Sequence, residues 1–132
     1  MSSGGGRIEH DSLGPVAVPQ DRLWGASTQR ALENFPRSAL PVHPALIAAL
    51  TRIKLAAARA NRALGLLPTD VADLIEHACQ DVLAGRIGGE HFPVDVFQTG
   101  SGTSTNTNLN EVIANRSAQL ALQPLGAKHP VH

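Results

Sequence analysis

Residues 44–65 have the sequence PALIAALTRIKLAAARANRALG, in which apolar side chains recur at alternating steps of four and three residues. This spacing predicts a long amphipathic helix, because it places those side chains along one face. Gly65 provides the left-handed residue that commonly ends a helix. Three arginines mostly avoid the apolar stripe and are expected to be solvated: Arg52, Arg59 and Arg62. The predicted buried stripe consists of Leu46, Leu50, Ile53, Ala57, Ala60 and Leu64.

A second helix is predicted over residues 69–84, with Thr69 as its cap and Gly85 as its stop. The short connection to the preceding helix favours an antiparallel pair. The expected buried face of this second helix consists of Val71, Leu74, Ile75, Ala78 and Val82.

Two further helices are predicted on either side of this pair. A short one follows Asp21, which can cap it, and ends before Pro36. A longer one runs from about residue 104 to residue 122, where apolar side chains again recur at helical spacing.

Two segments are expected to be extended. The stretch from Arg7 to Pro19 contains Gly14-Pro15, which suits an arm with a turn. The stretch from Phe92 to Phe97 alternates, and this places Val94 and Val96 on the same side.

The composition predicts one mainly α-helical domain. The length of 132 residues suits a single core, and 42% apolar but only 3% aromatic residues require a core of Ala, Leu, Ile and Val. We expect a disordered tail over residues 1–6 and one domain over residues 7–132. The lone Cys79 has no cysteine partner for a disulfide or a metal site, so a buried core position is expected.

The charge pattern excludes several classes of partner. Lys plus Arg and Asp plus Glu both number 11, with no basic cluster, so nucleic acid is not an expected partner. No segment has the uninterrupted apolar length of a membrane span, and the first six residues lack the apolar stretch of a secretory signal. We therefore expect a soluble, cytoplasmic protein with no membrane partner.

Residues 98–115, QTGSGTSTNTNLNEVIAN, have the strongest chemical character. Gly100 and Gly102 allow a tight turn, and Ser101 and Thr103 place hydroxyl groups directly before a helix whose free N–H groups face the same space. Such a site suits a carboxylate or phosphate. The segment has neither the Gly-Lys-Ser/Thr ending nor the Gly-x-Gly-x-x-Gly spacing of nucleotide-binding loops, so a small carboxylate is the preferred ligand. On composition alone, a polar loop that only caps the helix is the favoured interpretation.

The same region resembles a sequence block of class II fumarases. The resemblance consists of FPVDVFQTGSGT at residues 92–103, then Asn106, Asn108 and NEVIANR at residues 110–116. Residues 7–14, 23–30 and 33–36 resemble the family's amino-terminal segment in the same order. The resemblance covers nearly all of the chain beyond Gly6 but only about the first third of a family enzyme, without its central helical bundle and C-terminal domain.

This resemblance implies the aspartase/fumarase superfamily fold and the interconversion of fumarate and (S)-malate without a metal or organic cofactor. In that reaction, loss of a proton beside a carboxylate puts charge on the carboxylate, which fixed hydroxyl and N–H donors stabilise. Ser101 and Thr103 are thereby implied to bind substrate, with backbone access at Gly102 and a ligand role for Asn106. The family's catalytic serine and histidine lie downstream of His132, so no catalytic residue and no activity are expected in the isolated chain. Glu111 is expected to be a structural partner and not a base.

The last five residues, Lys128-His-Pro-Val-His132, resemble the start of the family's second, non-catalytic dicarboxylate site. His132 is therefore a candidate ligand of that site. His129 stands where the family often carries a basic side chain. For both, a flexible terminal residue is the alternative. The other histidines are mostly expected on the surface or in loops.

Three functions remain open at this point. The first is a fragment of a class II fumarase, and the second is a fragment of an aspartase, whose corresponding segment usually resembles Gly-Gly-Ala-Gly-Thr. The third is a non-catalytic module that binds a dicarboxylate or assembles with a full-length enzyme. In the family, long central helices form a homotetramer whose active sites combine three subunits. Without them, this chain is expected to be monomeric or weakly associating, with uncovered apolar surface.

Overall fold

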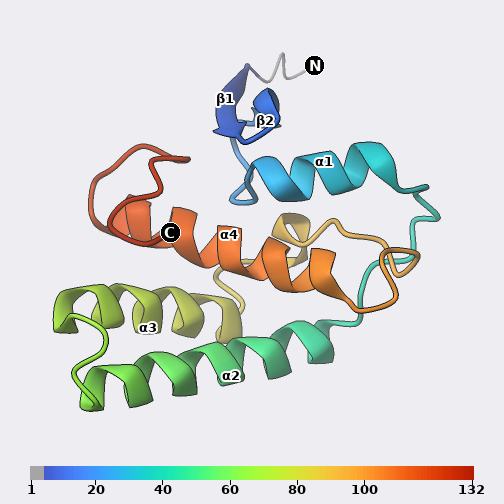
Figure 1. The fold of residues 1–132 in the computed structure, drawn as a ribbon. Helices are drawn as coiled ribbons and strands as arrows, with labels where there is room; N and C mark the ends of the chain where they lie inside the picture. Colours follow the sequence, from blue (N-terminus) through green and yellow to red (C-terminus); the bar gives the residue numbers. More distant parts are fainter. Residues whose placement is uncertain (1–4) are drawn as a thin grey trace.

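The structure of the protein, a computed structural model, describes residues 5–132 (Figure 1). The elements follow one another as strands β1 (Gly6–Asp11) and β2 (Gly14–Pro19), helices α1 (Ala26–Asn34), α2 (Pro44–Ala63) and α3 (Thr69–Leu83), the 3-10 turn η1 (Gly89–His91) and helix α4 (Thr103–Leu120). The predicted fold class, mainly α with a short extended arm, is confirmed. The predicted tail over residues 1–6 lies mostly outside the described residues, and Gly6, its last residue, opens β1 instead.

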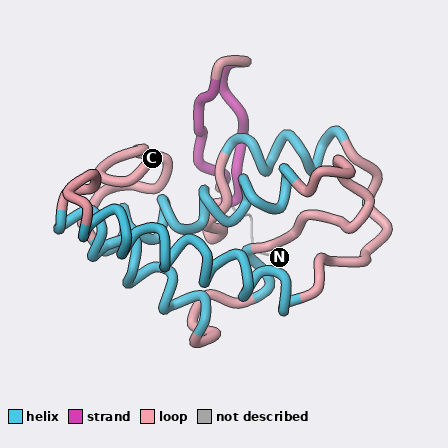
Figure 2. The backbone as a smooth tube through the Cα atoms, turned by 60° about the horizontal axis from the view of Figure 1, so that its bottom comes forward, coloured by secondary structure: helices cyan, strands magenta, loops and turns pink. Residues whose placement is uncertain are grey.

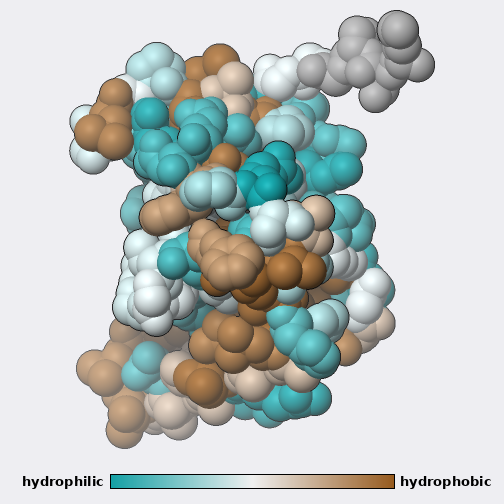
Figure 3. All heavy atoms as spheres, turned by 90° about the vertical axis from the view of Figure 1, so that its right-hand side faces the viewer, coloured by the Kyte–Doolittle hydropathy of each residue, from teal (hydrophilic) through white to brown (hydrophobic). Residues whose placement is uncertain are grey.

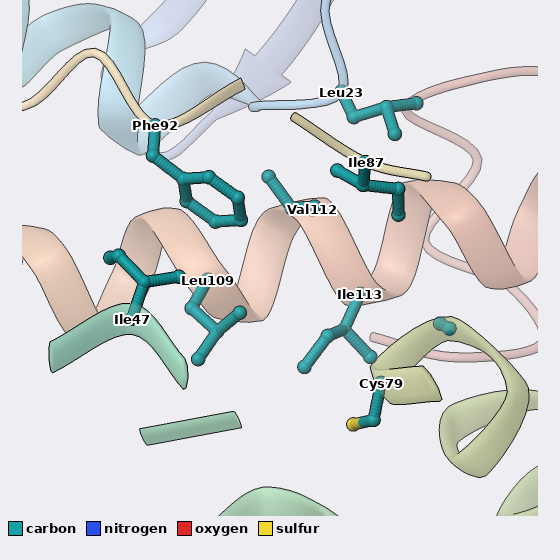
Figure 4. Close-up of a cluster of buried hydrophobic side chains, with 9 residues drawn as sticks. Leu23, Ile47, Cys79, Ile87, Phe92, Leu109, Val112 and Ile113 are labelled. Carbon is teal, nitrogen blue, oxygen red and sulfur yellow. The ribbon is translucent and has the colours of Figure 1, made fainter. Parts of the chain in front are cut away.

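Helix α4 is the centre of the fold. The antiparallel pair α2 and α3 packs on one side of it and α1 packs on the other (Figures 1 and 2). Leu109, Val112 and Ile113 of α4 are buried, and Figure 4 shows them directed toward residues from both sides. The other buried members of this core are Leu23, Ile47, Ala78, Cys79, Ile87 and Phe92.

The amino-terminal arm is an antiparallel hairpin in which Arg7 pairs with Val18. Val16 and Val18 are buried in a second small cluster with Trp24 and Ala26. The Arg7 guanidinium donates to the backbone carbonyls of Pro19, Arg22 and Trp24, at 2.7, 2.8 and 2.6 Å. This one side chain therefore holds the hairpin against the segment that leads into α1.

The prediction that Asp21 caps the first helix is wrong. The helix begins at Ala26, and Gly25 holds the N-cap position without a side chain to bond it. Asp21 instead forms an ion pair with Arg22 at 2.7 Å. The acceptor for the start of α1 comes from α4, where Glu111 Oε1 accepts from the N–H of Thr28 at 3.0 Å. A long-range contact thus replaces the local cap.

Helix α2 has the predicted bounds, but most of its predicted buried stripe is wrong. Ile53 and Leu64 are 65% and 70% exposed, whereas Ile47, Thr51 and Ala58 are buried. The helix has apolar residues around most of its circumference, so the contact with α3 and α4 decides which of them are covered. The exposed remainder agrees with the expected uncovered apolar surface: Leu46, Ile53, Ala57, Ala60 and Leu64.

The antiparallel pairing of α2 with α3 is confirmed, but two details differ. Thr69 is the first helical residue and not the cap, because Pro68 holds the N-cap position and no side chain bonds there. Arg59 and Arg62, expected to be solvated, form ion pairs with Glu76 and Asp73 of α3. Charged side chains thus join the two helices along their exposed edge.

The alternation predicted for residues 92–97 does not persist. Val94 is 4% exposed but Val96 is 46% exposed. Between them, the buried Asp95 carboxylate accepts from the Ser38 N–H at 2.7 Å and from the Phe97 N–H at 3.0 Å, and these bonds hold its pKa below the ordinary value. A turn around Asp95 therefore replaces the expected continuous strand.

Cys79 is fully buried, as predicted, and burial raises the pKa of its thiol to about 11. His91 ends the turn η1 and is half-buried: its Nδ1 accepts from the N–H of Leu23 at 3.1 Å, and burial lowers its pKa. Within residues 5–132, no helix is long and apolar enough to cross a membrane.

Candidate functional site

The segment from Gln98 to Thr103 leads into α4 through a tight turn. The N–H of Gly102 donates to the carbonyl of Thr99 at 2.9 Å. Gly102 then holds the N-cap position with φ of 73°, a left-handed conformation that glycine adopts without steric cost. The glycine predicted to give backbone access therefore lies at the start of the helix.

Two hydroxyl groups lie side by side at this turn. Ser101 Oγ and Thr103 Oγ1 are 2.8 Å apart, and both residues are exposed. Either hydroxyl can donate to a ligand oxygen while it accepts a hydrogen bond from the other hydroxyl. The structure thus brings together the two residues that the sequence singled out, on the open side of the turn.

The backbone N–H groups at the start of α4 divide into bonded and free ones. The N–H of Thr105 donates to Gln98 Oε1 at 3.0 Å, while Gln98 Nε2 donates to Thr105 Oγ1 at 2.6 Å. The N–H groups of Thr103 and Ser104 have no acceptor within the described chain. These two donors lie at the positive end of the helix dipole, next in sequence to the hydroxyl pair.

Asn106, the predicted ligand asparagine, is exposed and accepts a bond from Lys54 Nζ at 2.7 Å. Burial lowers the pKa of the Lys54 ammonium. Lys54 was not among the residues predicted for the site, although a lysine in the otherwise apolar stretch of residues 53–58 was a signal that could have found it. The site therefore contains a cation from α2 beside the first turn of α4.

The remaining asparagines of α4 have different surroundings. Asn108 is buried and donates to the carbonyl of His91 at 3.0 Å, whereas Asn110 is exposed. Asn115 is buried, donates to the Leu23 carbonyl and accepts from the Gly126 N–H, both at 2.8 Å. Asn108 and Asn115 thus join α4 to distant backbone segments, and Asn115 also lines the cavity beside α4.

A cavity of about 580 Å³ lies farther along α4, between β1, α2 and the C-terminal segment. Lys54 lines it and bonds to Asn106, so the cavity adjoins the first turn of the helix. His132 lies in its wall, while His129 is exposed and outside the lining. The polar lining includes Glu9, Asp11, Lys54, Asn110, Lys128 and His132.

Glu111 also lines this cavity, and its contacts agree with the structural role expected for it. Burial raises the pKa of Glu111 to about 7, although bonds from Thr28 oppose this shift. Its Oε1 serves as the acceptor for the start of α1. The sequence contained one indirect signal of this contact: Gly25 offers no side chain to cap its own helix.

Exposed apolar side chains lie near the turn before α4. The exposed Val96 and Phe97 precede this turn. The exposed Leu40 lies beside them in the structure, since its carbonyl accepts from the Val96 N–H at 3.0 Å. Figure 3 shows hydrophobic atoms across the middle and lower part of this face. The polar turn thus has an apolar surface beside it. Within residues 5–132, no group of three His, Cys, Asp or Glu side chains could hold a metal ion.

Comparison with known proteins identifies the class to which this arrangement belongs. The sequence profile of the lyase family matches residues 14–132, and the chain belongs to that family. Among solved structures, a fumarate lyase:delta crystallin from Brucella melitensis is 45% identical with a TM-score of 0.90, covering 96% of this chain and 28% of that one. A class II fumarase from Schistosoma mansoni is 37% identical with a TM-score of 0.85, covering 91% of this chain and 26% of that one.

The curated relatives narrow the class further. Fumarate hydratase class II 1 of Pseudomonas aeruginosa is 58% identical over 96% of this chain and 27% of its own length. Fumarate hydratase class II of Halobacterium salinarum is 53% identical over 94% of this chain and 27% of its own length. The resemblance to class II fumarases is confirmed, and the chain spans about a quarter of the length of these relatives.

Proposed function

We propose that the first turn of α4 binds a carboxylate group of fumarate or (S)-malate and that this turn forms part of a class II fumarase active site. The observation that carries this proposal is the grouping of four donors at one turn: the hydroxyls of Ser101 and Thr103 and the unbonded N–H groups of Thr103 and Ser104. Lys54 adds a positive charge next to them through Asn106. Donors of this kind stabilise the charge that develops on a carboxylate when the adjacent proton leaves.

The reaction also needs a base and a proton donor. Lys54 and Asn106, which lie beside this turn, supply no base: the Lys54 ammonium donates to the Asn106 amide oxygen, and an amide does not take up a proton. The missing groups are therefore assigned to the part of a fumarase that corresponds to no residue of this chain. On this proposal the chain alone does not hydrate fumarate, and its uncovered apolar face on α2 is where further helices pack. The names of the curated relatives favour this function over aspartase.

The first test is direct binding. Amide NMR spectra of the chain are titrated with fumarate, malate and, as a monoanion control, acetate. Shifts of the Thr103 and Ser104 amides with both dicarboxylates are expected, and they should be lost in S101A/T103V. The matched control S12A removes an exposed hydroxyl in the hairpin turn and should keep the shifts. The proposal fails if these amides do not respond or respond equally in both variants.

The second test is activity. Fumarate hydration is followed by absorbance for the chain alone and after mixing with a full-length class II fumarase that keeps its catalytic serine but carries substitutions at the positions corresponding to Ser101 and Thr103. We expect no fumarate hydration by the chain alone and measurable hydration after mixing. This gain in hydration should be absent when the chain carries S101A/T103V. Hydration by the chain alone would contradict the proposed division of the active site. Binding without any gain on mixing would favour the binding-module alternative.

His132 and His129 are assigned to a second carboxylate site by the same family resemblance. In support, His132 and Lys128 both line the cavity beside α4, so two basic side chains face one space. His129 lies outside that lining. Malate titrations of H132A and H129A test the assignment: loss of shifts around residue 128 in H132A, with no change at Ser104, is the expected result.

A further inference from the structure

Two acidic side chains meet at the seam where β1, the start of α1, the middle of α4 and the C-terminal segment (residues 124–132) come together. A Cβ placed on Gly25 would lie 2.1 Å from Glu111 Oε2 and 3.0 Å from Glu9 Oε1. A Cβ on Gly126 would lie 2.8 Å from Glu9 Cγ. The two carboxyl groups are therefore enclosed between two glycine backbones, with no room for a side chain on either glycine.

The two carboxyl groups have unequal partners. Glu9 Oε2 accepts from the Arg7 guanidinium at 2.7 Å. Glu111 Oε1 accepts from the Thr28 N–H, and the Gly25 N–H also favours the ionised form, but Glu111 Oε2 is buried and has no partner within residues 5–132 at hydrogen-bond geometry. A buried, ionised oxygen without a donor is costly, whereas a protonated one can itself donate.

The other charged groups around Glu9 and Glu111 either have partners of their own or line other parts of the cavity. Asp11 of β1 pairs with Arg30 at 2.6 Å, and Lys128 Nζ donates to the His10 carbonyl at 2.8 Å. Burial is the main cause that raises the pKa of Glu111 to about 7, and the negative charge of Glu9 adds to it. The charged or titratable groups that face the pair across the cavity are Asp11 from β1, Lys54 from α2, and Lys128 and His132 from the C-terminal segment.

We propose that Glu111 is protonated at Oε2 in the folded chain, beside the Glu9 carboxylate that pairs with Arg7, and that loss of this proton to solvent loosens the seam. With both groups ionised, two negative charges face each other between Gly25 and Gly126. Their repulsion would move β1 and the C-terminal segment away from the start of α1. The device is independent of the carboxylate site proposed at Ser101.

The direction of the pH effect follows from linkage. The folded chain holds this proton more tightly than the unfolded chain, because the pKa of Glu111 rises from 4.5 to about 7 on folding. The pair therefore favours the folded state fully below pH 4.5. That contribution is lost as the pH rises through about 7.

The test is a side-chain carboxyl titration of the whole chain by ¹³C NMR, with hydrogen exchange at the Thr28 and Gly126 amides. We expect a Glu111 midpoint near 7, and a midpoint below 5 overturns the proposal. Corrected for intrinsic rates, protection of both amides should fall at least about tenfold between pH 5 and pH 8.

The matched variants are E111Q and E33Q. The E111Q amide keeps an acceptor for Thr28 and removes the group that ionises, so it should abolish the pH dependence of protection. E33Q changes an exposed carboxyl of α1 and should retain it. Equal pH dependence in the two variants overturns the proposal. If E111Q does not fold, the Glu111 midpoint in the unaltered chain still decides.

Discussion

The first turn of α4 and its middle turns contain similar polar residues but use them in different ways. At the first turn, the Ser101 and Thr103 hydroxyls contact each other and remain exposed. In the middle, Glu111 and Asn115 bond to the backbone of other segments and are largely enclosed. One sequence block thus serves two purposes: donors left open for a ligand, and buried groups that join distant parts of the chain.

The largest effect is expected for N115A, which tests the closed region. It leaves the Leu23 carbonyl and the Gly126 N–H without their buried partner. Unsatisfied groups of this kind lower the free energy of unfolding by about 2–4 kcal/mol together. Urea denaturation checks this against N110A, an exposed asparagine of the same helix, for which about 0.5 kcal/mol or less is expected. Equal losses would remove the contrast.

A smaller loss is expected for G25A. The added methyl group would lie 2.1 Å from Glu111 Oε2, so Glu111 must move and release the Thr28 N–H. Loss of the acceptor at a helix start costs about 1 kcal/mol, and crowding adds to it, for about 1–3 kcal/mol in all. The comparison is G100A, whose methyl group meets nothing within 4 Å. Thermal unfolding of both variants measures the difference.

Q98A sharpens the boundary between the two regions. The Gln98 side chain makes two hydrogen bonds to Thr105 and so joins the two ends of the turn that contains Ser101. Their loss should cost about 1–2 kcal/mol of unfolding free energy. It should also weaken the fumarate-induced shifts at Ser104, because the turn that presents the hydroxyls is no longer held. Unchanged shifts in Q98A would mean that the turn is held by its backbone bonds alone.

The smallest effect on stability is expected for S101A/T103V. Both side chains are exposed, and within residues 5–132 they bond only to each other, so unfolding free energy should change by about 0.5 kcal/mol or less. Dicarboxylate binding should nevertheless be lost. Urea denaturation alongside the amide titration separates the two readings. A stability loss as large as that of N115A would show that the first turn also belongs to the closed framework.

Much of the fold could be predicted from local patterns. The ends of α2 and α4 were placed within about two residues, since apolar spacing and stop residues such as Gly65 are local signals. The buried face of α2 could not be predicted, because its apolar residues surround most of the helix. The start of α1 was also misplaced, since its acceptor comes from Glu111, 83 residues away in sequence from Thr28.

The candidate site divides in the same way. Ser101, Gly102 and Thr103 lie together at a helix start as their sequence implied, although their ligand role is still a prediction. Lys54 stood out in its apolar stretch, but its place in the site could not be predicted, because it lies 52 positions before Asn106 in the sequence and meets it only in the folded chain. Gln98 belongs to the same polar segment, residues 98–115, but its two hydrogen bonds to Thr105 depend on the turn that Gly102 makes.

The sequence by itself determined the helices, the hairpin turn and the donors grouped before α4, because propensity, spacing and capping act within a few residues. The tertiary structure decided which face of α2 is covered, which acceptor begins α1, and which acidic groups meet between Gly25 and Gly126. The physical reason is that burial and electrostatic coupling depend on atoms brought together from distant positions. Only the folded chain places Glu9 beside Glu111 and so changes what either carboxyl group can do.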